Sequence, residues 1–591
     1  RKLPAVETLG SATVVCSDKT GTLTRNEMTV RALHDGSAAY AVSGEGYAPT
    51  GDITTQAGYG LARPEGDLRL TLLAGLLCNE SSLEFDGAQA TPKGDPTEVA
   101  LITAAGKAGL DQDSQHAQAK RLVLLPFESD RGYMASVHAE DPGPVLYAKG
   151  APERLLELCG DDGDPERHQR LHRAAEDMAA RGMRVLGMAV KPLSGPVPEH
   201  IREEDLHGAR VTGLAGIIDP PRPESVDAVA GCARAGIRTV MITGDHVVTA
   251  KAIASAIGIG GPNPHAVTGR ELERLSDDEL YELVPRVGVF ARVAPEHKLR
   301  ITRQLMRRGE IVAMTGDGVN DAPALRAAHI GVAMGVAGTD VAREASDMIL
   351  ADDNFATIFA AVEEGRIVYE NIKKVTLYLL SGGFGVLLCI VASVLLGWPL
   401  PLSAAQILWF NFVTSALMDV SLTFERGEPG LLERPPRPPS EGLLDAQVLR
   451  RMVLVGGLMS AASMWLFQDV SARALAAGAD PGDALDKART MTLCALAFFQ
   501  FFQAFNSRSL TRSVFVLNPL GNPVLFVALG TAVLLQLGVV SLPALEWVVD
   551  TRPLTWAELG LAVGVAASVV PLVELDKLLT AWSARRGRRR A

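Results

Sequence analysis

The sequence is poor in charge and in aromatic residues. Only 21% of its 591 residues are Asp, Glu, Lys or Arg, and 5% are Phe, Trp or Tyr. The hydrophobic fraction, 47%, is high for a purely soluble protein, and the chain is too long for a single core. We therefore expect several domains, one of them in a lipid bilayer.

Clusters of basic residues and paired cysteines are scarce as well. The formal net charge is −11, and the one basic cluster is at residues 585–590. Because nucleic-acid backbones recruit proteins through clustered Lys and Arg, we expect no nucleic-acid partner. The 6 cysteines stand far apart, with no Cys-x-x-Cys pair and no metal-ligand spacing, so we expect reduced and mostly buried thiols.

The chain also lacks an initiator Met and a charged-then-apolar leader at its start. We therefore expect no signal peptide. We interpret the sequence as a piece of a longer protein whose N-terminal half is missing.

The distribution of apolar residues changes at about residue 374. Before it, short β-branched runs alternate with amphipathic stretches, which predicts an α/β fold with a parallel sheet. After it come nearly uncharged runs long enough to cross a bilayer, and their number favours membrane spans over the buried helices of a soluble bundle. The six predicted spans are 375–397, 403–424, 452–470, 491–507, 523–543 and 556–576. The fourth is short and contains Gln500 and Gln503, so it is the weakest of these predictions.

Three short apolar segments, 12–16, 239–242 and 311–314, are each followed closely by polar residues. Open α/β sheets bind ligands at the carboxyl edge of their strands, so we expect these residues to meet at one edge. The polar sequences are Ser17-Asp18-Lys19-Thr20-Gly21-Thr22, Thr243-Gly244-Asp245 and Thr315-Gly316-Asp317-Gly318-Val319-Asn320-Asp321.

These strand ends supply the groups that phosphoryl transfer requires: a carboxylate nucleophile, donors for the phosphoryl oxygens and acidic ligands for Mg²⁺. Lys298 adds a cation that can hold the aspartate and the phosphate together. The predicted catalytic residues are Asp18, Thr20, Thr243, Gly244, Asp245 and Lys298, and the predicted Mg²⁺ ligands are Asp18, Thr20, Asp317 and Asp321.

The sequence at 18–22 resembles the phosphorylation motif of P-type ATPases. The sequences at 243–245 and 315–321 match two other phosphorylation-domain motifs of that family, in the expected order and with Lys298 between them. The resemblance is to the calcium-pump-like, cation-transporting branch. It implies a haloacid-dehalogenase-like Rossmannoid phosphorylation domain, with ATP and Mg²⁺ as cofactors.

The residue two positions after the nucleophile separates pumps from phosphatases. Soluble phosphatases of the haloacid-dehalogenase superfamily carry a second Asp there as general acid and base. This chain has Thr20, which does not readily deprotonate an attacking water. We therefore expect an aspartyl phosphate that persists through a conformational step, as a pump requires.

Between the first two motifs lies a long insertion, which the resemblance identifies as an α+β nucleotide-binding domain. Its matching segments are 93–98, 126–131, 149–153 and 181–186. Phe127 can stack on adenine, Lys149 can lie beside the ring or reach phosphate, and Arg184 can meet phosphate oxygens. The candidate cofactor-binding residues are Glu98, Phe127, Lys149, Gly150, Arg184, Arg292 and Asn320.

The expected organisation places a phosphorylation domain at 1–30 and 219–370, the nucleotide-binding domain at 31–218, and an all-α, six-helix transmembrane domain at 371–591. Asp219-Pro220-Pro221-Arg222 resembles the hinge by which the chain re-enters the phosphorylation domain. With the soluble part in the cytoplasm, 13 Lys and Arg residues fall in inside loops and the tail and 4 fall outside. We therefore expect a multi-pass protein of the cell membrane, with the lipid bilayer as a partner.

The first two spans resemble the fifth and sixth helices of calcium-pump-like relatives. The second of those helices offers oxygens to the transported cation. Several calcium-pump acids are replaced here, so the identity of the cation stays open, and Asp419 lies one helical turn after Ser415, where it can supply a carboxylate. The transport-site candidates are Asn411, Thr414, Ser415, Asp419 and Gln500.

Two alternatives to a cation pump stay open at this stage. One is a membrane-tethered haloacid-dehalogenase-type phosphatase, and the other is an inactive nucleotide-binding remnant. The second follows from what the resemblance implies is missing, namely the actuator domain and four preceding spans. As given, the chain is expected to bind nucleotide but not to complete transport.

Overall fold

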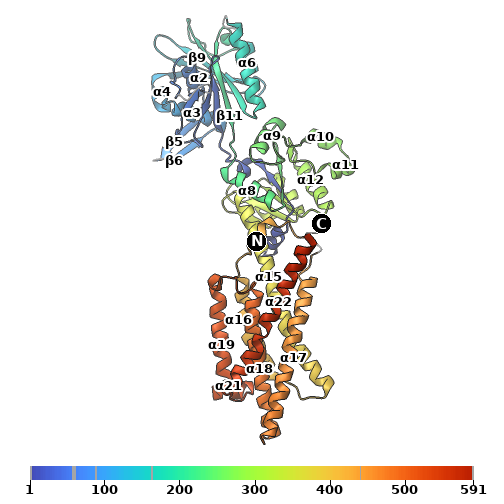
Figure 1. Ribbon diagram of the computed structural model, residues 1–591. Coiled ribbons are helices and arrows are strands. Elements are labelled where there is room, and N and C mark those ends of the chain that lie inside the picture. Colours follow the sequence, from blue (N-terminus) through green and yellow to red (C-terminus); the bar gives the residue numbers. More distant parts are fainter. Residues whose placement is uncertain (1–2, 56–60, 87–88, 161–163, 439–440, 589–591) are drawn as a thin grey trace. The chain divides into compact units, whose positions relative to one another are not determined.

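The computed structural model describes residues 3–55, 61–86, 89–160, 164–438 and 441–588. The chain divides into two compact units, Arg1–Ala5 with Ala12–Ala360 and Val6–Ser11 with Ala361–Ala591. The first unit holds two large sheets, and the second is helical (Figure 1).

A seven-stranded parallel sheet forms one part of the first unit, in the order β13-β14-β12-β1-β15-β16-β17. Its inner strands are apolar and buried, as strands covered on both faces must be. The strands are β1 (Val14–Asp18), β12 (Arg238–Thr243), β13 (Ala266–Thr268), β14 (Val289–Ala291), β15 (Val312–Gly316), β16 (Ile330–Met334) and β17 (Met348–Leu350).

Helices follow the strands of this sheet. Helix α12, for example, buries Ile301 and Leu305 against the sheet and leaves Arg303 exposed. The helices are α8 (Pro223–Arg234), α9 (Val247–Ala256), α10 (Gly269–Arg274), α11 (Asp277–Leu283), α12 (Pro295–Arg307), α13 (Ala322–Ala327) and α14 (Asp340–Ala345).

The register of the parallel sheet decides which side chains meet. In the β1–β12 pair Asp18 lies opposite Ile242, and in the β1–β15 pair Cys16 lies opposite Met314. The three strands therefore end within a residue or two of one another, and their carboxyl ends form one edge.

An eight-stranded antiparallel sheet forms the other part of the first unit, in the order β4-β3-β2-β11-β10-β9-β8-β7. A separate hairpin joins β5 (Ser82–Asp86) and β6 (Gln89–Lys93). The strands are β2 (Thr29–His34), β3 (Ala39–Val42), β4 (Ile53–Thr55), β7 (Lys120–Leu125), β8 (Tyr133–Ala139), β9 (Val145–Gly150), β10 (Arg184–Pro192) and β11 (Arg210–Ile218).

Two apolar cores pack on this sheet, one around Leu72, Leu76 and Leu101 and the other around Leu155 and Leu171. The helices that carry them are longer than the two short connecting helices, α4 and α7. Their bounds are α2 (Gly66–Leu77), α3 (Pro96–Lys107), α4 (Gln112–Gln118), α5 (Pro152–Cys159), α6 (Pro165–Ala180) and α7 (Glu203–Leu206).

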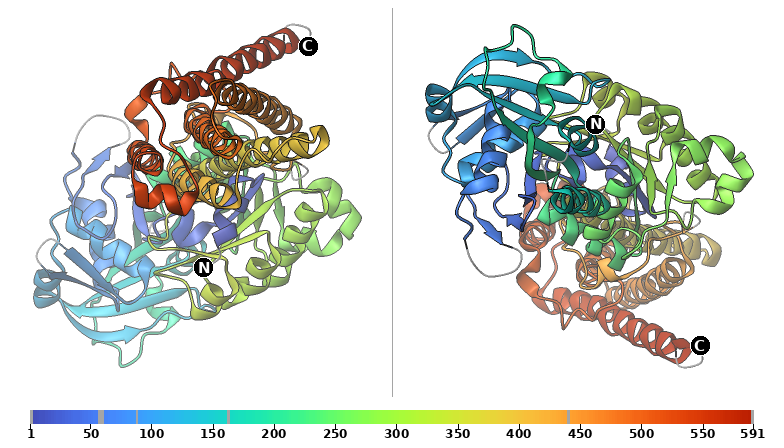
Figure 2. Two further views of the ribbon diagram at one scale, coloured as in Figure 1. Left: turned by 90° about the horizontal axis from the view of Figure 1, so that it is seen from below. Right: turned by 90° about the horizontal axis from the view of Figure 1, so that it is seen from above.

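The second unit is a helical bundle, whose helices run side by side when they are viewed end on (Figure 2). Helix α18 lies inside it and is buried over most of its length. Its helices are α1 (Leu3–Gly10), α15 (Phe355–Leu396), α16 (Ala404–Thr423), α17 (Ala446–Ala476), α18 (Pro481–Ser507), α19 (Pro523–Val539), α20 (Pro543–Val549), α21 (Trp556–Ala567) and α22 (Val569–Arg588). The first residues of α1 and α15, at 3–5 and 355–360, belong to the first unit.

Among the described residues, four helical segments are long and apolar enough to cross a membrane: α15, α16, α17 and the continuous stretch over α21 and α22. The pair α19 and α20, bent by 89°, can form a fifth. The predicted span 491–507 falls in α18, which does not meet the same hydropathy criterion. Because α18 is surrounded by other helices, it can carry polar residues such as Gln500 and Gln503 without exposing them to lipid.

The predicted fold class is confirmed: α/β sheets are followed by a helical unit with several apolar helices. Helix α15 is longer than the predicted span at 375–397, because it begins at Phe355 in a charged stretch. The second unit has the character of a multi-pass membrane protein.

Candidate active site

Asp18 ends strand β1 and begins a tight turn over residues 19–23. Its Oδ1 accepts a hydrogen bond from the Lys19 N–H at 2.7 Å, and its own N–H donates to the Thr315 hydroxyl at 3.2 Å. Gly21, with φ at 73°, provides the left-handed residue that the turn needs. These contacts fix the carboxylate at the carboxyl edge of the sheet and leave its second oxygen for another partner.

Lys298 contacts that second oxygen. It lies in the first turn of α12, and its Nζ is 2.6 Å from Asp18 Oδ2 and 2.7 Å from Asp321 Oδ1. Burial by itself would lower the pKa of Lys298, but the carboxylates of Asp18 and Asp321 outweigh it and raise that pKa. Lys298 is therefore a fixed cation between two strand ends, as the sequence predicted it to be near the aspartate.

Asp317 completes a cluster of three carboxylates with Asp18 and Asp321. Each can offer an oxygen to one point, and these oxygens lie within 4.8 Å of one another. Burial and the negative charges of Asp18 and Asp321 raise the pKa of Asp317. Hard carboxylate oxygens crowded in this way fit Mg²⁺, whose charge would relieve their repulsion.

The loop after β15 is shaped by Asp321. Its Oδ2 accepts hydrogen bonds from the N–H groups of Asp317 at 3.2 Å and Gly318 at 3.1 Å. A Cβ on Gly316 would lie 2.5 Å from the Cβ of Asp321, so only glycine fits at that position. The spacing of the Thr-Gly-Asp-Gly motif thus has a local steric cause.

The Thr243-Gly244-Asp245 segment lies at the end of the neighbouring strand β12. The Thr243 hydroxyl accepts from the Asp245 N–H at 3.1 Å, while Gly244 is exposed at the edge. Asp245 is 3.0 Å from Lys19 Nζ and so faces the turn beside Asp18. Thr20 is half-buried in that turn, two residues after Asp18.

Lys19 is a site residue that the sequence analysis did not assign. It is 4% exposed, and its Nζ lies 3.2 Å from Asp219 Oδ2 as well as close to Asp245. Burial would lower the pKa of Lys19, but these two carboxylates outweigh it and raise that pKa. Thr24 also donates to Asp219 Oδ2, at 2.6 Å. Lys19 therefore ties the Asp18 turn to the second strand end and to the Asp-Pro-Pro segment.

Two predicted cofactor residues lie at the rim of this site. Arg292 has φ at 51° and is exposed, and its N–H donates to the Asp245 carbonyl at 3.1 Å. Asn320 is exposed in the short 3₁₀ turn Val319–Asp321. Both side chains are accessible to a ligand at the sheet edge.

The other five predicted cofactor residues line a single cavity of about 420 Å³ in the antiparallel-sheet part. They come from four separate segments, namely helix α3, the loop after β7, strand β9 and strand β10. The five are Glu98, Phe127, Lys149, Gly150 and Arg184.

The lining of this cavity includes an ion pair and an exposed aromatic ring. Lys149 is buried with its Nζ 2.7 Å from Glu98 Oε1, and Ser81 donates to Glu98 Oε2 at 2.7 Å. Burial raises the pKa of Glu98, but Lys149 outweighs it and the net pKa is lowered. Phe127 is 52% exposed, which is unusual for a phenylalanine and leaves its ring face free for stacking.

The transport-site candidates lie in α16 and α18. Asn411 is exposed and donates to the Ile407 carbonyl of its own helix at 3.1 Å. The side chains of Thr414 and Ser415 lie outside the described residues. Asp419 is half-buried, Gln500 is buried, and each has one buried oxygen with no hydrogen-bond partner among the described residues. Asp419 and Gln500 therefore have oxygens available for a further ligand.

Family models match two regions of the chain. The model described as P-type ATPase, cytoplasmic domain N, matches residues 67–224, and that described as cation transporting ATPase, C-terminus, matches residues 399–579. Together the two regions cover more than half of the chain.

Curated proteins match almost the whole chain. A probable cation-transporting ATPase F of Mycobacterium tuberculosis is 42% identical over 98% of this chain and 64% of its own length. A calcium-transporting ATPase of Bacillus subtilis is 41% identical over 96% and 64%, and a calcium-transporting ATPase type 2C member 1 of Bos taurus is 36% identical over 98% and 59%. The chain thus spans less than two thirds of the length of these relatives.

Proposed function

The chain belongs to the P-type ATPases, in their calcium-pump-like branch, and from this premise we propose that it is the catalytic and membrane part of an ATP-driven cation pump. The observation that carries the proposal is the bridge from Lys298 to Asp18 and Asp321, with Asp317 in the same cluster. Lys298 and the three carboxylates come from three segments of the chain, namely the end of β1, the first turn of α12 and the loop after β15. Their convergence suits one phosphoryl group.

The domain assignment follows the same reasoning. We assign residues 1–30 and 219–370 to phosphorylation, 31–218 to nucleotide binding and 371–591 to the membrane. The parallel sheet supports the first assignment, the antiparallel sheet the second and the helical unit the third. The excess of Lys and Arg in one set of loops supports a cytoplasmic location for the first two.

In the proposed reaction an Asp18 carboxylate oxygen attacks the terminal phosphorus of ATP. An O–P bond forms to Asp18, the bond from that phosphorus to the bridging oxygen breaks, and ADP leaves with the electron pair. Lys298 holds the carboxylate in place and offsets negative charge on the phosphoryl oxygens. The Thr243 hydroxyl and the Gly244 N–H, at the next strand end, are the donors assigned to those oxygens.

The acidic cluster is assigned to Mg²⁺. Asp18, Asp317 and Asp321 would hold the ion, and Thr20 is a further candidate ligand from the Asp18 turn. When bound, Mg²⁺ would neutralise charge on the phosphate oxygens. Asp321 also keeps its loop in shape through its two backbone hydrogen bonds.

Thr20 supports a pump over the alternative of a tethered phosphatase. A threonine hydroxyl is a poor general base, so this position does not speed hydrolysis of the aspartyl phosphate. The similarity to cation-transporting ATPases over almost the whole chain points the same way. The alternative of an inactive remnant is opposed by the five predicted cofactor-binding residues that line one cavity.

For the nucleotide we assign adenine stacking to Phe127 and phosphate contact to Arg184. Lys149 is assigned a supporting role, because its ammonium already pairs with Glu98 and is only slightly exposed. It would hold the Glu98 carboxylate in position. Arg292 and Asn320 are assigned to the phosphate end, since they lie at the rim of the Asp18 site.

Replacing Phe127 by Ala should weaken ATP binding about tenfold, because a stacking aromatic face is lost from the cavity lining. Isothermal titration with a non-hydrolysable ATP analogue measures this. Phe85→Ala is a matched control, since Phe85 is 53% exposed on the β5 strand and does not line the cavity. If Phe127→Ala and the unmutated protein bound the ATP analogue with equal affinity, Phe127 would be excluded as a nucleotide contact.

For the transported cation we assign Asp419 as the carboxylate ligand, with Asn411, Thr414, Ser415 and Gln500 as further oxygen ligands. The Oδ1 of Asp419 is buried and has no hydrogen-bond partner in the described part of the chain. This supports the role, since an intramembrane acid is costly unless it binds a partner. The names of the relatives make a cation, and calcium among the candidates, the first choices for the cargo.

In the full-length protein, ATPase activity should rise with one of Ca²⁺, Mn²⁺, Mg²⁺, Na⁺ or K⁺, and Asp419→Asn should raise the half-activating concentration of that ion at least about tenfold. Asp469→Asn is the control, because Asp469 lies in another membrane helix, α17, and pairs with Arg473. Unchanged ion activation in Asp419→Asn would exclude Asp419 as a ligand.

A further inference from the structure

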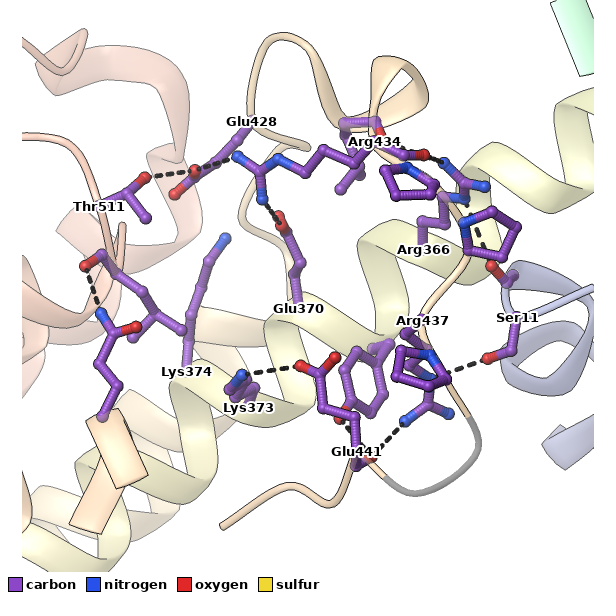
Figure 3. Close-up of a pocket in the computed structure, with 18 residues that line it drawn as sticks. Ser11, Arg366, Glu370, Lys373, Lys374, Glu428, Arg434, Arg437, Glu441 and Thr511 are labelled. Atoms are coloured by element: carbon purple, nitrogen blue, oxygen red, sulfur yellow. Dashed lines mark hydrogen bonds and ion pairs between the residues drawn. The ribbon is translucent and has the colours of Figure 1, made fainter. Parts of the chain in front are cut away.

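The second unit contains a cavity of about 450 Å³, and none of its lining residues belongs to the phosphorylation site. It is bounded by the first part of α15, the loop after α16, the start of α17 and the loop at 510–511 (Figure 3). The apolar run of α15 begins at Val375, directly after the lining residues Lys373 and Lys374. The cavity therefore lies at the level where a span leaves the hydrocarbon and enters the lipid head groups.

Most charges around this cavity are paired. Lys373 lies 2.5 Å from Asp445 and 3.4 Å from Glu441, and Arg434 lies 3.2 Å from Glu370 Oε1. Arg437 lies 3.1 Å from Glu7 and stacks over the ring of Tyr369. The lining has five cationic side chains (Arg366, Lys373, Lys374, Arg434 and Arg437) and three acidic ones (Glu370, Glu428 and Glu441). Two further acids outside the lining, Asp445 and Glu7, pair with Lys373 and Arg437, so that acidic and cationic side chains are equal in number when these partners are included.

One cationic and one acidic group at the cavity, the Lys374 ammonium and Glu370 Oε2, have fewer hydrogen bonds than they can make. Lys374 is 1% exposed, and among the described residues its ammonium donates only to the Asn371 amide oxygen, at 3.0 Å. Glu370 Oε2 is buried and has no hydrogen-bond partner there. The two residues are one turn apart on α15, and Figure 3 shows the Lys374 side chain extending between Glu370 and Glu428. Their charged ends nevertheless do not approach within ion-pair distance.

Buried charged groups of this kind require polar partners. A ligand that satisfies both groups must accept a hydrogen bond from the Lys374 ammonium and donate one to Glu370 Oε2. It must also carry no net charge, because the cationic and acidic side chains around the cavity, ion-pair partners included, are equal in number. We propose that the cavity binds the phosphoethanolamine zwitterion, as the head group of an aminophospholipid, with its phosphate on Lys374 and its ammonium on Glu370 Oε2. Choline carries the same charge but has no N–H to donate, so it fits the Glu370 oxygen less well.

The test uses the full-length protein in nanodiscs that contain phosphatidylethanolamine and phosphatidylcholine in equal amounts. Native mass spectrometry after detergent release counts the lipids that the protein retains. We expect phosphatidylethanolamine to be retained about tenfold over phosphatidylcholine, and this preference to vanish in Lys374→Met and Glu370→Gln. Glu370→Gln keeps the size of the side chain, so its effect does not depend on repacking.

Lys487→Met is the matched control, because Lys487 pairs with Glu558 near the start of α18, roughly 30 Å along that helix from the loop at 508–511.

Lipid binding is measured without ATP turnover, so its outcome is independent of the proposed pump activity. Displacement of the lipid by soluble phosphoethanolamine would show that the head group alone is recognised, and persistence of the lipid would show that the acyl chains contribute. Equal retention of both lipids, or a preference that survives both variants, would overturn the proposal.

Discussion

Replacing Asp18 by Asn is expected to abolish the acid-stable phosphoprotein that the full-length protein forms with labelled ATP and Mg²⁺, a loss of at least about 10³-fold in labelling rate. An amide keeps the shape of the side chain but lacks the nucleophilic anion. Its NH₂ group also cannot accept from Lys298, whose Nζ lies 2.6 Å from Asp18 Oδ2. Acid quenching and gel autoradiography, with and without hydroxylamine, measure the loss.

Asp227→Asn is the matched control for this change, since Asp227 is an exposed acid on α8 of the same unit. It should label as the unmutated protein does. Nucleotide affinity, measured separately, should be nearly the same in Asp18→Asn and the unmutated protein, because the nucleotide cavity is lined by other residues. Persistent hydroxylamine-labile labelling of Asp18→Asn would refute the assignment of the nucleophile.

Replacing Lys298 by Met should give the second largest effect, a fall in the phosphorylation rate of about 10²- to 10³-fold. The change removes the cation that touches two of the three clustered carboxylates and leaves their repulsion uncompensated. Rapid-quench measurement of phosphoenzyme formation at saturating ATP separates this rate from nucleotide binding.

Two further variants distinguish chemistry from folding for Lys298. Arg303→Met removes an exposed cation of the same helix and should leave the rate unchanged. Lys298→Arg retains the charge with a different shape and should recover part of the rate. A Lys298→Met protein that phosphorylates at the normal rate would show that the cation is not needed for transfer.

The convergence of the three strand ends was predictable because it depends on local signals. Buried apolar strands ending in polar motifs identify a sheet edge, and parallel register then brings Asp18, Thr243 and Asp317 to the same side. Lys298 was predicted to be near Asp18, and the structure gives it a second partner, Asp321. The five nucleotide residues of the antiparallel-sheet part were likewise expected together, and all of them line one cavity.

Contacts between distant segments were not predictable. Lys19 pairs with Asp219 across 200 residues of sequence, and no periodicity or spacing signals such a pair. A similar pair lies in the helical unit, where Arg508 donates to Glu425 at 3.0 Å in a buried position. Hydropathy assigns both residues to loops, because it cannot show that the loops pack against each other.

The helix ends also depart from the hydropathy pattern for physical reasons. Helix α15 extends from Phe355 through charged residues because a helix does not have to stop where the lipid ends. Residues 523–543 form one apolar run in the sequence and were predicted as a single span, yet the chain bends by 89° between α19 and α20. Pro543, at the start of α20, lacks the N–H that would continue a helix.

The central claim is that Asp18, held by Lys298 at the meeting point of three strands, accepts the phosphoryl group. Reduction of the acid-quenched phosphoprotein with borohydride converts a phosphorylated aspartate to homoserine, and peptide mass spectrometry then locates it. We expect homoserine at position 18 and at no other acid. Homoserine at any other position, with Asp18 unchanged, would contradict it.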